Sequence, residues 1–130
     1  MNVIVCGGRA YLDQAKVDDV LDTLNWQCPI KAILQGGATG ADALAREWAE
    51  RKNIKVRTYI AGKQRTGHAS WSRGNQRMID EGNPDLVVAF PGVKRTDDMI
   101  RRARIAGVTL LRINVDGDDP ILLDGLRWSA

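Results

Sequence analysis

Cysteine and histidine are scarce in this chain of 130 residues, and it has no long apolar run. The two cysteines are Cys6 and Cys28, and the one histidine is His68. A disulfide scaffold uses more cysteines than this, and a structural zinc site needs clustered ligands. We therefore expect no disulfide framework, no metal site and no cofactor.

The sequence also has no segment that predicts contact with a membrane. It begins with "MNVIVCGG", which is typical of a strand and has no basic leader. No run approaches the roughly 20 apolar residues that a membrane-spanning helix needs. We expect a cytoplasmic protein without a membrane partner.

The excess of positive charge is small. The 19 Lys and Arg residues against 16 Asp and Glu residues give a net charge of +3. This charge alone does not predict a protein that wraps a nucleic-acid backbone. The cations are concentrated between residues 51 and 112, so one side of the protein is expected to be electropositive.

The composition is that of an ordinary globular domain, with 44% hydrophobic and 27% charged residues. A chain of 130 residues fits one domain, which we place at residues 1–115. The tail, residues 116–130, is rich in Asp and Gly and then apolar. We expect the tail to pack on the domain or on another subunit.

Short β-branched runs alternate with segments of helical apolar spacing. The runs predict strands over residues 2–6, 30–35, 54–60, 85–90 and 108–114. The spacing predicts helices over residues 12–26, 41–53, 70–82 and 97–107. Alternation with strands as apolar as "DLVVAF" indicates an α/β fold, a Rossmann-like three-layer sandwich with a parallel sheet of about five strands.

Three glycine-bearing loops follow the first, second and fourth strands, and in such a fold they meet at one edge of the sheet. They are "CGGRAY", "QGGATGAD" and "FPGVKRTDD". Glycine lets the backbone approach a ligand, and helix N-termini attract anions such as phosphate. The ligand-binding candidates in these loops are Gly7, Gly8, Arg9, Gly36, Gly37, Thr39, Asp42, Pro91, Gly92, Lys94, Arg95 and Thr96.

Several of these polar residues also have a structural interpretation. Thr39 is a plausible N-cap of the second helix with Asp42 completing a capping box, or else Asp42 faces a ligand ribose or a cation. Thr96 is a plausible N-cap of the fourth helix, with Asp97 and Asp98 in its first turn. Both interpretations stay open from sequence alone.

The cations of the loops are harder to explain by helix capping. Arg9 either decorates a turn or forks to a phosphate or carboxylate. Lys94 and Arg95 lie beside the start of the fourth helix, where only solvent or an anionic ligand suits them. His68 is an ordinary loop residue or a general acid or base.

Four motifs together resemble the SLOG superfamily, in particular its small YspA-related members. They are "VCGGR", "QGGATGADALAREWA", "RGNQRMID" and "PDLVVAFPG" followed by "TDDMIRRARIAG", and they span roughly residues 2–113. The resemblance implies a Rossmann-like fold whose glycine loops hold a nucleotide or a nucleotide-derived ligand. It also includes Asn75 among the ligand-binding candidates.

Larger relatives of this superfamily, the Lonely Guy phosphoribohydrolases, cleave the N-glycosidic bond of nucleoside monophosphates. Their PGGxGTxxE motif binds phosphate and supplies an acid, whose place Asp98 takes here, and an arginine of the preceding helix assists. Arg73 and Arg77 are the candidates for that arginine. Two glycines of the motif are replaced by Val93 and Arg95, which weakens the hydrolase hypothesis more than the binding hypothesis.

Three functions remain. We favour a non-enzymatic protein that senses or sequesters a nucleotide-derived small molecule, as a homo-oligomer (a dimer or tetramer) or with a separate partner. The alternative is an N-glycosidic hydrolase with Asp98 as acid or nucleophile and Arg73 or Arg77 orienting the phosphate. Nucleic-acid binding, with Trp71 stacking on a base, is less favoured.

Overall fold

The computed structural model describes residues 1–60 and 68–113, with the side chains of residues 68–71 left aside. The strands are β1 (Asn2–Cys6), β2 (Ala32–Gln35), β3 (Lys55–Thr58), β4 (Leu86–Ala89) and β5 (Thr109–Arg112). The helices are α1 (Gln14–Gln27), α2 (Ala41–Arg51), α3 (His68–Gly82) and α4 (Lys94–Ala106). The interpretations of His68, Trp71 and the tail fall on side chains or residues outside this description.

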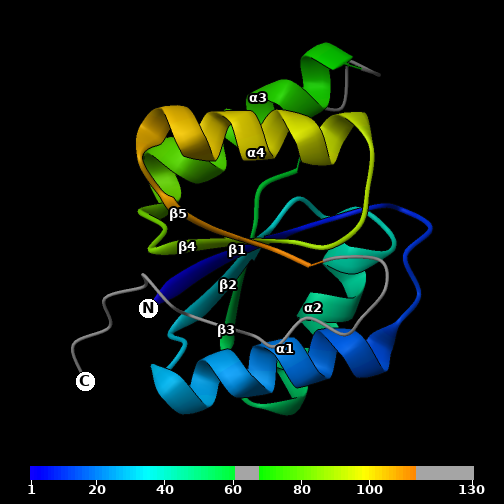
Figure 1. Ribbon diagram of the computed structural model, residues 1–130, viewed down its shortest axis with the longest axis vertical. Coiled ribbons are helices and arrows are strands. Elements are labelled where there is room, and N and C mark those ends of the chain that lie inside the picture. The colour runs from blue at the N-terminus through cyan, green and yellow to red at the C-terminus, as the bar shows by residue number, and fades with distance from the viewer. Residues whose placement is uncertain (61–67, 114–130) are drawn as a thin grey trace.

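The five strands form one parallel sheet in the order β3-β2-β1-β4-β5. Helices α3 and α4 cover one face of the sheet, and α1 and α2 cover the other (Figure 1). The predicted α/β class, the Rossmann-like three layers and the parallel sheet of five strands are confirmed. Within residues 1–60 and 68–113, no helix is long and apolar enough to cross a membrane.

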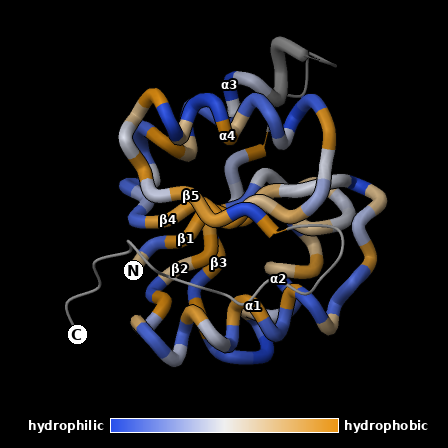
Figure 2. The backbone as a smooth tube through the Cα atoms, viewed as in Figure 1, coloured by the Kyte–Doolittle hydropathy of each residue, from blue (hydrophilic) through white to orange (hydrophobic). Residues whose placement is uncertain are grey.

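Alternation of side chains along the central strands produces two separate cores. Val3 and Val5 of β1 belong to the core beneath α1 and α2, whereas Ile4 and Cys6 belong to the core beneath α3 and α4. The four residues of β4 are all buried. The central strands accordingly form the most hydrophobic part of the tube in Figure 2, and the helices have polar outer faces.

The element boundaries differ from the predicted ones mainly at the ends. The second strand begins two residues later than expected, at Ala32, and the fourth helix begins three residues earlier, at Lys94. The prediction that Thr96 caps this helix is wrong: its N-cap is Val93, without a side-chain hydrogen bond, and Thr96 is buried inside the first turn. Contact between the neighbouring loops, described below, fixes this start.

The strand order determines which loops can form a site. Strands β2, β1 and β4 are neighbours in the sheet and all run in the same direction. Their carboxyl ends therefore lie at the same edge of the sheet. The chain extends the sheet from β1 through β2 to β3 on one side, and through β4 to β5 on the other side, so the strand order reverses at β1. The loops that carry the three glycine motifs follow these three strands.

Candidate functional site

The β1–α1 and β4–α4 loops contact each other through their backbones. The Gly8 N–H donates to the Pro91 carbonyl at 2.8 Å, and the Gly8 carbonyl accepts from the N–H of Ala41 at 3.2 Å. A Cβ on Gly92 would lie 2.7 Å from the Gly8 nitrogen and would also collide with the Thr96 hydroxyl. Glycine at position 92 is thus required for this close approach.

A cavity of about 700 Å³ lies between these two loops. Its lining combines backbone-rich glycine segments, three cationic side chains and several apolar side chains. The lining residues are Gly7, Gly8, Arg9, Ala10, Tyr11, Pro91, Gly92, Val93, Lys94, Arg95 and Thr96. The structure therefore brings together the predicted candidates of the first and fourth loops.

The first turn of α4 presents donors to this cavity. Its N-cap, Val93, provides no side-chain acceptor, and within the described parts of the chain the backbone N–H groups of Lys94, Arg95 and Thr96 have no hydrogen-bond acceptor. All three residues line the cavity. Unpaired amides at the positive end of a helix are suited to hold an anion.

The β2–α2 loop is arranged differently, because its amides already have an acceptor. Gly36 and Ala38 donate their N–H groups to Asp42 Oδ2 at 3.1 and 3.2 Å. Arg95 Nη2 lies 4.0 Å from the same oxygen, and its guanidinium packs against Gly36, where a Cβ would collide with it. Asp42 therefore faces a cation, one of the two interpretations that the sequence left open.

The predicted capping box at the start of α2 is wrong. The N-cap of α2 is Gly40, which has a φ of 74° and no side chain to accept a bond. The Thr39 hydroxyl instead donates to the Arg9 carbonyl at 3.2 Å, which joins the β2–α2 loop to the β1–α1 loop. Burial raises the pKa of Asp42, and the nearby Arg95 and the two amide donors only partly oppose this shift.

Gly37 lies apart from the cavity. Its N–H donates to Gln35 Oε1 at 2.6 Å, and a Cβ would meet the side chains of Thr58 and Ile60 on the β3 side. Gln35 in turn donates to the Thr58 hydroxyl at 2.6 Å. Gly37 therefore shapes the turn towards β3 and is not part of the cavity lining.

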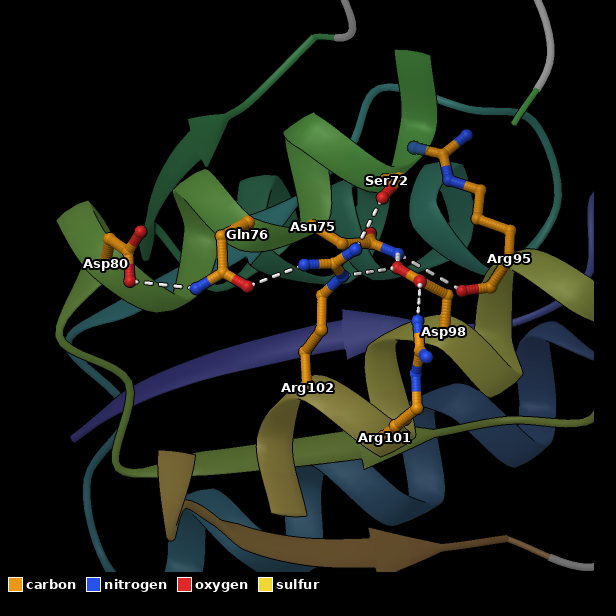
Figure 3. A network of polar contacts seen from close by, with 8 residues as sticks. All are labelled: Ser72, Asn75, Gln76, Asp80, Arg95, Asp98, Arg101 and Arg102. Carbon is orange, nitrogen blue, oxygen red and sulfur yellow. Dashed lines mark hydrogen bonds and ion pairs between the residues drawn. The ribbon is translucent and has the colours of Figure 1, made fainter. Parts of the chain in front are cut away.

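Asp98 lies in a polar network between α3 and α4 (Figure 3). Its carboxylate accepts from Arg102 at 2.7 Å, from Asn75 at 2.9 Å and from Arg101 at 3.0 Å. Burial opposes ionisation of Asp98, but the hydrogen bonds from Arg102, Asn75 and Arg101 outweigh burial and lower its pKa. Asp98 is thus held as a carboxylate against α3.

The network extends from Asp98 to the backbone of the cavity. Arg102 also donates to Gln76 at 2.7 Å and to the Ser72 hydroxyl, both on α3. Asn75 donates to the Arg95 carbonyl at 3.2 Å as well as to Asp98. Asn75 is buried, and these two bonds hold the first turn of α4 against α3. Asn75 does not line the cavity.

The two arginines considered for phosphate orientation, Arg73 and Arg77, do not line the cavity. Arg77 pairs with Glu81 at 2.8 Å and lies over the ring of Tyr59, 5.6 Å from its centroid. Arg73 is exposed on α3. The structure therefore places these two side chains away from the loops that meet around Gly8.

Three lining residues were not predicted from sequence: Ala10, Tyr11 and Val93. Tyr11 is half-buried, and its ring lies 5.4 Å from that of Phe90, with the planes tilted by 35°. The signal for Tyr11 was present, since it closes the "CGGRAY" motif two residues after Arg9.

Comparison with known proteins gives relatives in sequence and in structure. The chain is 29% identical over 126 residues to the Gene 61 protein of Mycobacterium phage D29, with 91% of this chain and 98% of the relative covered. DNA processing protein A (DprA) from Streptococcus pneumoniae matches 95% of the chain at 20% identity and a TM-score of 0.71. The match to the structural-genomics target TM1055 covers 85% of this chain and 72% of the TM1055 chain, at 16% identity and a TM-score of 0.63.

The structural neighbours share the fold, and the chain spans 53% of the DprA chain. A family model described as YspA, cpYpsA-related SLOG matches residues 1–65, which contain β1, β2, β3 and two of the three glycine loops. The sequence motifs, the strand order and this match agree. The chain belongs to the YspA, cpYpsA-related SLOG family.

Proposed function

We propose that the chain binds a nucleotide or a nucleotide-derived ligand in the cavity between the β1–α1 and β4–α4 loops. One observation carries this proposal: a single cavity of about 700 Å³ combines unpaired helix amides, three cationic side chains and apolar side chains. This volume is in the usual range for small-molecule sites, about 300–1,000 Å³. Membership of the SLOG family supports the same ligand class.

The phosphate belongs at the first turn of α4. The amides of Lys94, Arg95 and Thr96 supply donors, and the helix end favours negative charge by about 0.3–1 kcal/mol. Each hydrogen bond from a charged side chain such as Arg95 or Lys94 adds about 1.5–3 kcal/mol. Arg9, exposed on the facing loop, supplies the third cation.

The nucleoside belongs along the apolar part of the lining. Ala10, Tyr11 and Val93 line the cavity together with Pro91. An aromatic ring beside a base contributes about 1–3 kcal/mol in single-stranded nucleic-acid complexes. Tyr11 is the candidate for this contact, since it is the aromatic residue of the lining.

Binding is better supported than N-glycosidic hydrolysis. A general acid needs a pKa near the working pH and must reach the reacting atom. Asp98 has a lowered pKa, accepts three hydrogen bonds and is absent from the cavity lining. As an acid at neutral pH it would first have to leave Arg102, Arg101 and Asn75.

Calorimetric titration with adenosine monophosphate tests the proposal, together with chromatography for released adenine. We expect saturable binding without free adenine, and a higher melting temperature with ligand. Lys94→Ala combined with Arg95→Ala should weaken binding about a hundredfold or more, since two charge-assisted contacts are lost. Arg104→Ala, an exposed arginine in the last turn of the same helix, is the matched control.

Unchanged affinity in the Lys94 and Arg95 double variant would reject this site. Accumulating adenine would instead support the hydrolase alternative, and Asp98→Ala would then have to abolish the turnover. A nucleic-acid strand is the second candidate, because Arg9 and Lys94 are exposed at the cavity and the DprA relative is by name a DNA-processing protein. Oligonucleotide binding that falls steeply with salt would favour it over a free nucleotide.

A further inference from the structure

The first turn of α4 receives no support from its own N-cap. That N-cap, Val93, makes no side-chain hydrogen bond, and the amides of Lys94, Arg95 and Thr96 have no acceptor within the described residues. A helix end without a capping side chain is less stable than a capped one and frays more readily. The direction in which these three amides point must therefore be fixed by contacts from other parts of the fold.

One of these contacts comes from Asn75 on α3, 20 positions before the residue whose carbonyl it binds. Its side-chain nitrogen donates to the Arg95 carbonyl at 3.2 Å and to Asp98 Oδ2 at 2.9 Å, as Figure 3 shows. Both hydrogens of the amide nitrogen are therefore used, and both acceptors belong to α4. Asn75 is only 2% exposed, so water has no access to take its place at the carbonyl.

The Arg95 carbonyl belongs to the same peptide unit as the Thr96 N–H. A peptide unit is planar, and in the trans form, which the described peptide bonds all have, its carbonyl and its N–H point in opposite directions. The bond that draws the carbonyl towards α3 thus orients the N–H of Thr96 away from α3, and Thr96 lines the cavity. A donor at the carbonyl also polarises the peptide unit and strengthens its N–H as a donor.

We propose that Asn75 is a positioning residue for anion binding: by holding the Arg95 carbonyl, it orients the Thr96 N–H towards an anion in the cavity. The inference rests on the proposed function, because it concerns the phosphate end of the same cavity. Asn75 contributes to affinity without touching the ligand, which differs from the direct contact that the family resemblance implied. It also makes α3 part of the binding site, although no α3 residue with a described side chain lines the cavity.

Calorimetric titration of Asn75→Leu with adenosine monophosphate tests this role. Leucine has a similar size and preserves the packing between α3 and α4, but its side chain donates no hydrogen bond. The affinity should fall about five- to tenfold, which corresponds to the loss of one well-oriented hydrogen bond to the anion. A fall of less than about twofold would overturn the inference.

Gln76→Leu is the matched control, because it removes the amide of the next residue on the same helix. Gln76 also joins α3 to α4, since its Oε1 atom accepts from Arg102 at 2.7 Å, but neither of its hydrogen bonds involves the first turn of α4. Both variants should lower the melting temperature, whereas only Asn75→Leu should weaken binding. Equal losses of affinity would mean that Asn75 serves only the packing of the two helices.

Nuclear magnetic resonance separates the orientation of the amide from general damage to the fold. Adenosine monophosphate should shift the Thr96 amide signal through the phosphate and the Tyr11 ring signals through the base. At saturating ligand, Asn75→Leu should reduce the Thr96 shift and leave the Tyr11 shift unchanged, whereas Gln76→Leu should alter neither. A Thr96 shift in Asn75→Leu that equals the wild-type shift would contradict the proposed role.

A second variant keeps the test decisive if Asn75→Leu does not fold. Asn75→Ser is smaller and retains a hydroxyl, which has a single hydrogen to donate and cannot hold both acceptors. The affinity for adenosine monophosphate should then fall in the same direction by a smaller factor. Wild-type affinity in this folded variant would reject the role of Asn75.

Failure of the proposed function gives a different pattern of results. If the wild-type protein does not bind adenosine monophosphate, or binds it without any dependence on Lys94 and Arg95, the proposed function itself fails. If binding depends on those two residues but Asn75→Leu and Gln76→Leu bind equally well, only the role of Asn75 is rejected.

Discussion

Asp42 and Asp98 each have 5% of their surface exposed, yet the pKa values of their carboxyl groups shift in opposite directions. Burial raises the pKa of Asp42, which has two backbone donors and an arginine at 4.0 Å. Asp98 is subject to the same effect of burial, but its pKa is lowered by two arginines and an asparagine in direct contact. The balance between burial and the charge and distance of the donors decides the direction of each shift.

The difference separates a carboxylate bonded between two helices from one that shares a cation with the cavity. Asp98 joins α3 to α4 through Arg101, Arg102 and Asn75, none of which lines the cavity. Asp42 shares its main cation, Arg95, with the cavity. Asp98 therefore acts within the helix pair, whereas Asp42 is coupled to the cavity through Arg95.

Removing Asp98 should have the largest effect. Asp98→Ala removes the carboxylate that the partly buried Arg102 shares with the buried Asn75, and breaking such a network costs about 3 kcal/mol of unfolding free energy. Urea denaturation at neutral pH measures this loss. Asp97→Ala, an exposed acid in the first turn of the same helix, should cost less than about 1 kcal/mol. Equal losses would mean that the network adds nothing.

The pH dependence of stability should differ between the two aspartates. Because the pKa of Asp98 is lowered, its stabilisation is complete above the unfolded carboxyl value of about 3.9 and disappears as the pH falls through the lower folded value. The difference in unfolding free energy between wild type and Asp98→Asn, measured in urea, should therefore be constant near neutral pH and should decrease towards zero in acid. A gap that widens in acid would contradict the lowered pKa.

Gly36→Ala perturbs Asp42 mainly through Arg95, although the new Cβ would also lie 3.2 Å from Asp42 Oδ2. The new Cβ would displace the Arg95 guanidinium from its place against Gly36, at a cost of about 1 kcal/mol or slightly more. Asp42 would then lose its nearest cation, and its pKa should rise further. Carboxyl titration by NMR measures this shift. The pKa of Asp98 provides the internal reference and should not move.

Asp42→Asn should have the smallest effect on stability, within about 1 kcal/mol of wild type and in the stabilising direction. Its raised pKa means that the ionised form is penalised in the folded state at neutral pH, and that this penalty is relieved as the pH falls towards the unfolded value. The advantage of asparagine should therefore shrink in acid. A loss comparable to that of Asp98→Ala would remove the distinction between the two residues.

The sequence predicted the sheet well because its signal is repeated. Each apolar run predicts one strand, and alternation with helices leaves few arrangements other than a parallel sandwich. The meeting of the first and fourth loops followed from that topology, as the bond between Gly8 and Pro91 illustrates. Boundaries were less accurate, since strand ends depend on neighbouring strands.

The roles of single polar residues were less predictable. Thr39 and Thr96 have local cap patterns, yet Thr39 bonds to the Arg9 carbonyl, 30 positions away, and Thr96 is buried below Gly92. Asp98 receives Asn75 from a helix 23 positions earlier. Such partners are set by how loops and helices pack, and no local spacing encodes them.

One wall of the cavity is made of main chain, from Gly7 and Gly8 on one side to Pro91 and Gly92 on the other. The free amides of Lys94, Arg95 and Thr96 follow directly on this wall and do not depend on the side chains of the lining, provided that the two loops stay joined. On the proposed function, substitutions at Ala10, Tyr11 or Val93 would adapt the cavity to a different base or sugar without removing these amide donors. For protein engineering, the backbone of the cavity can therefore be kept while the side chains that line it are changed.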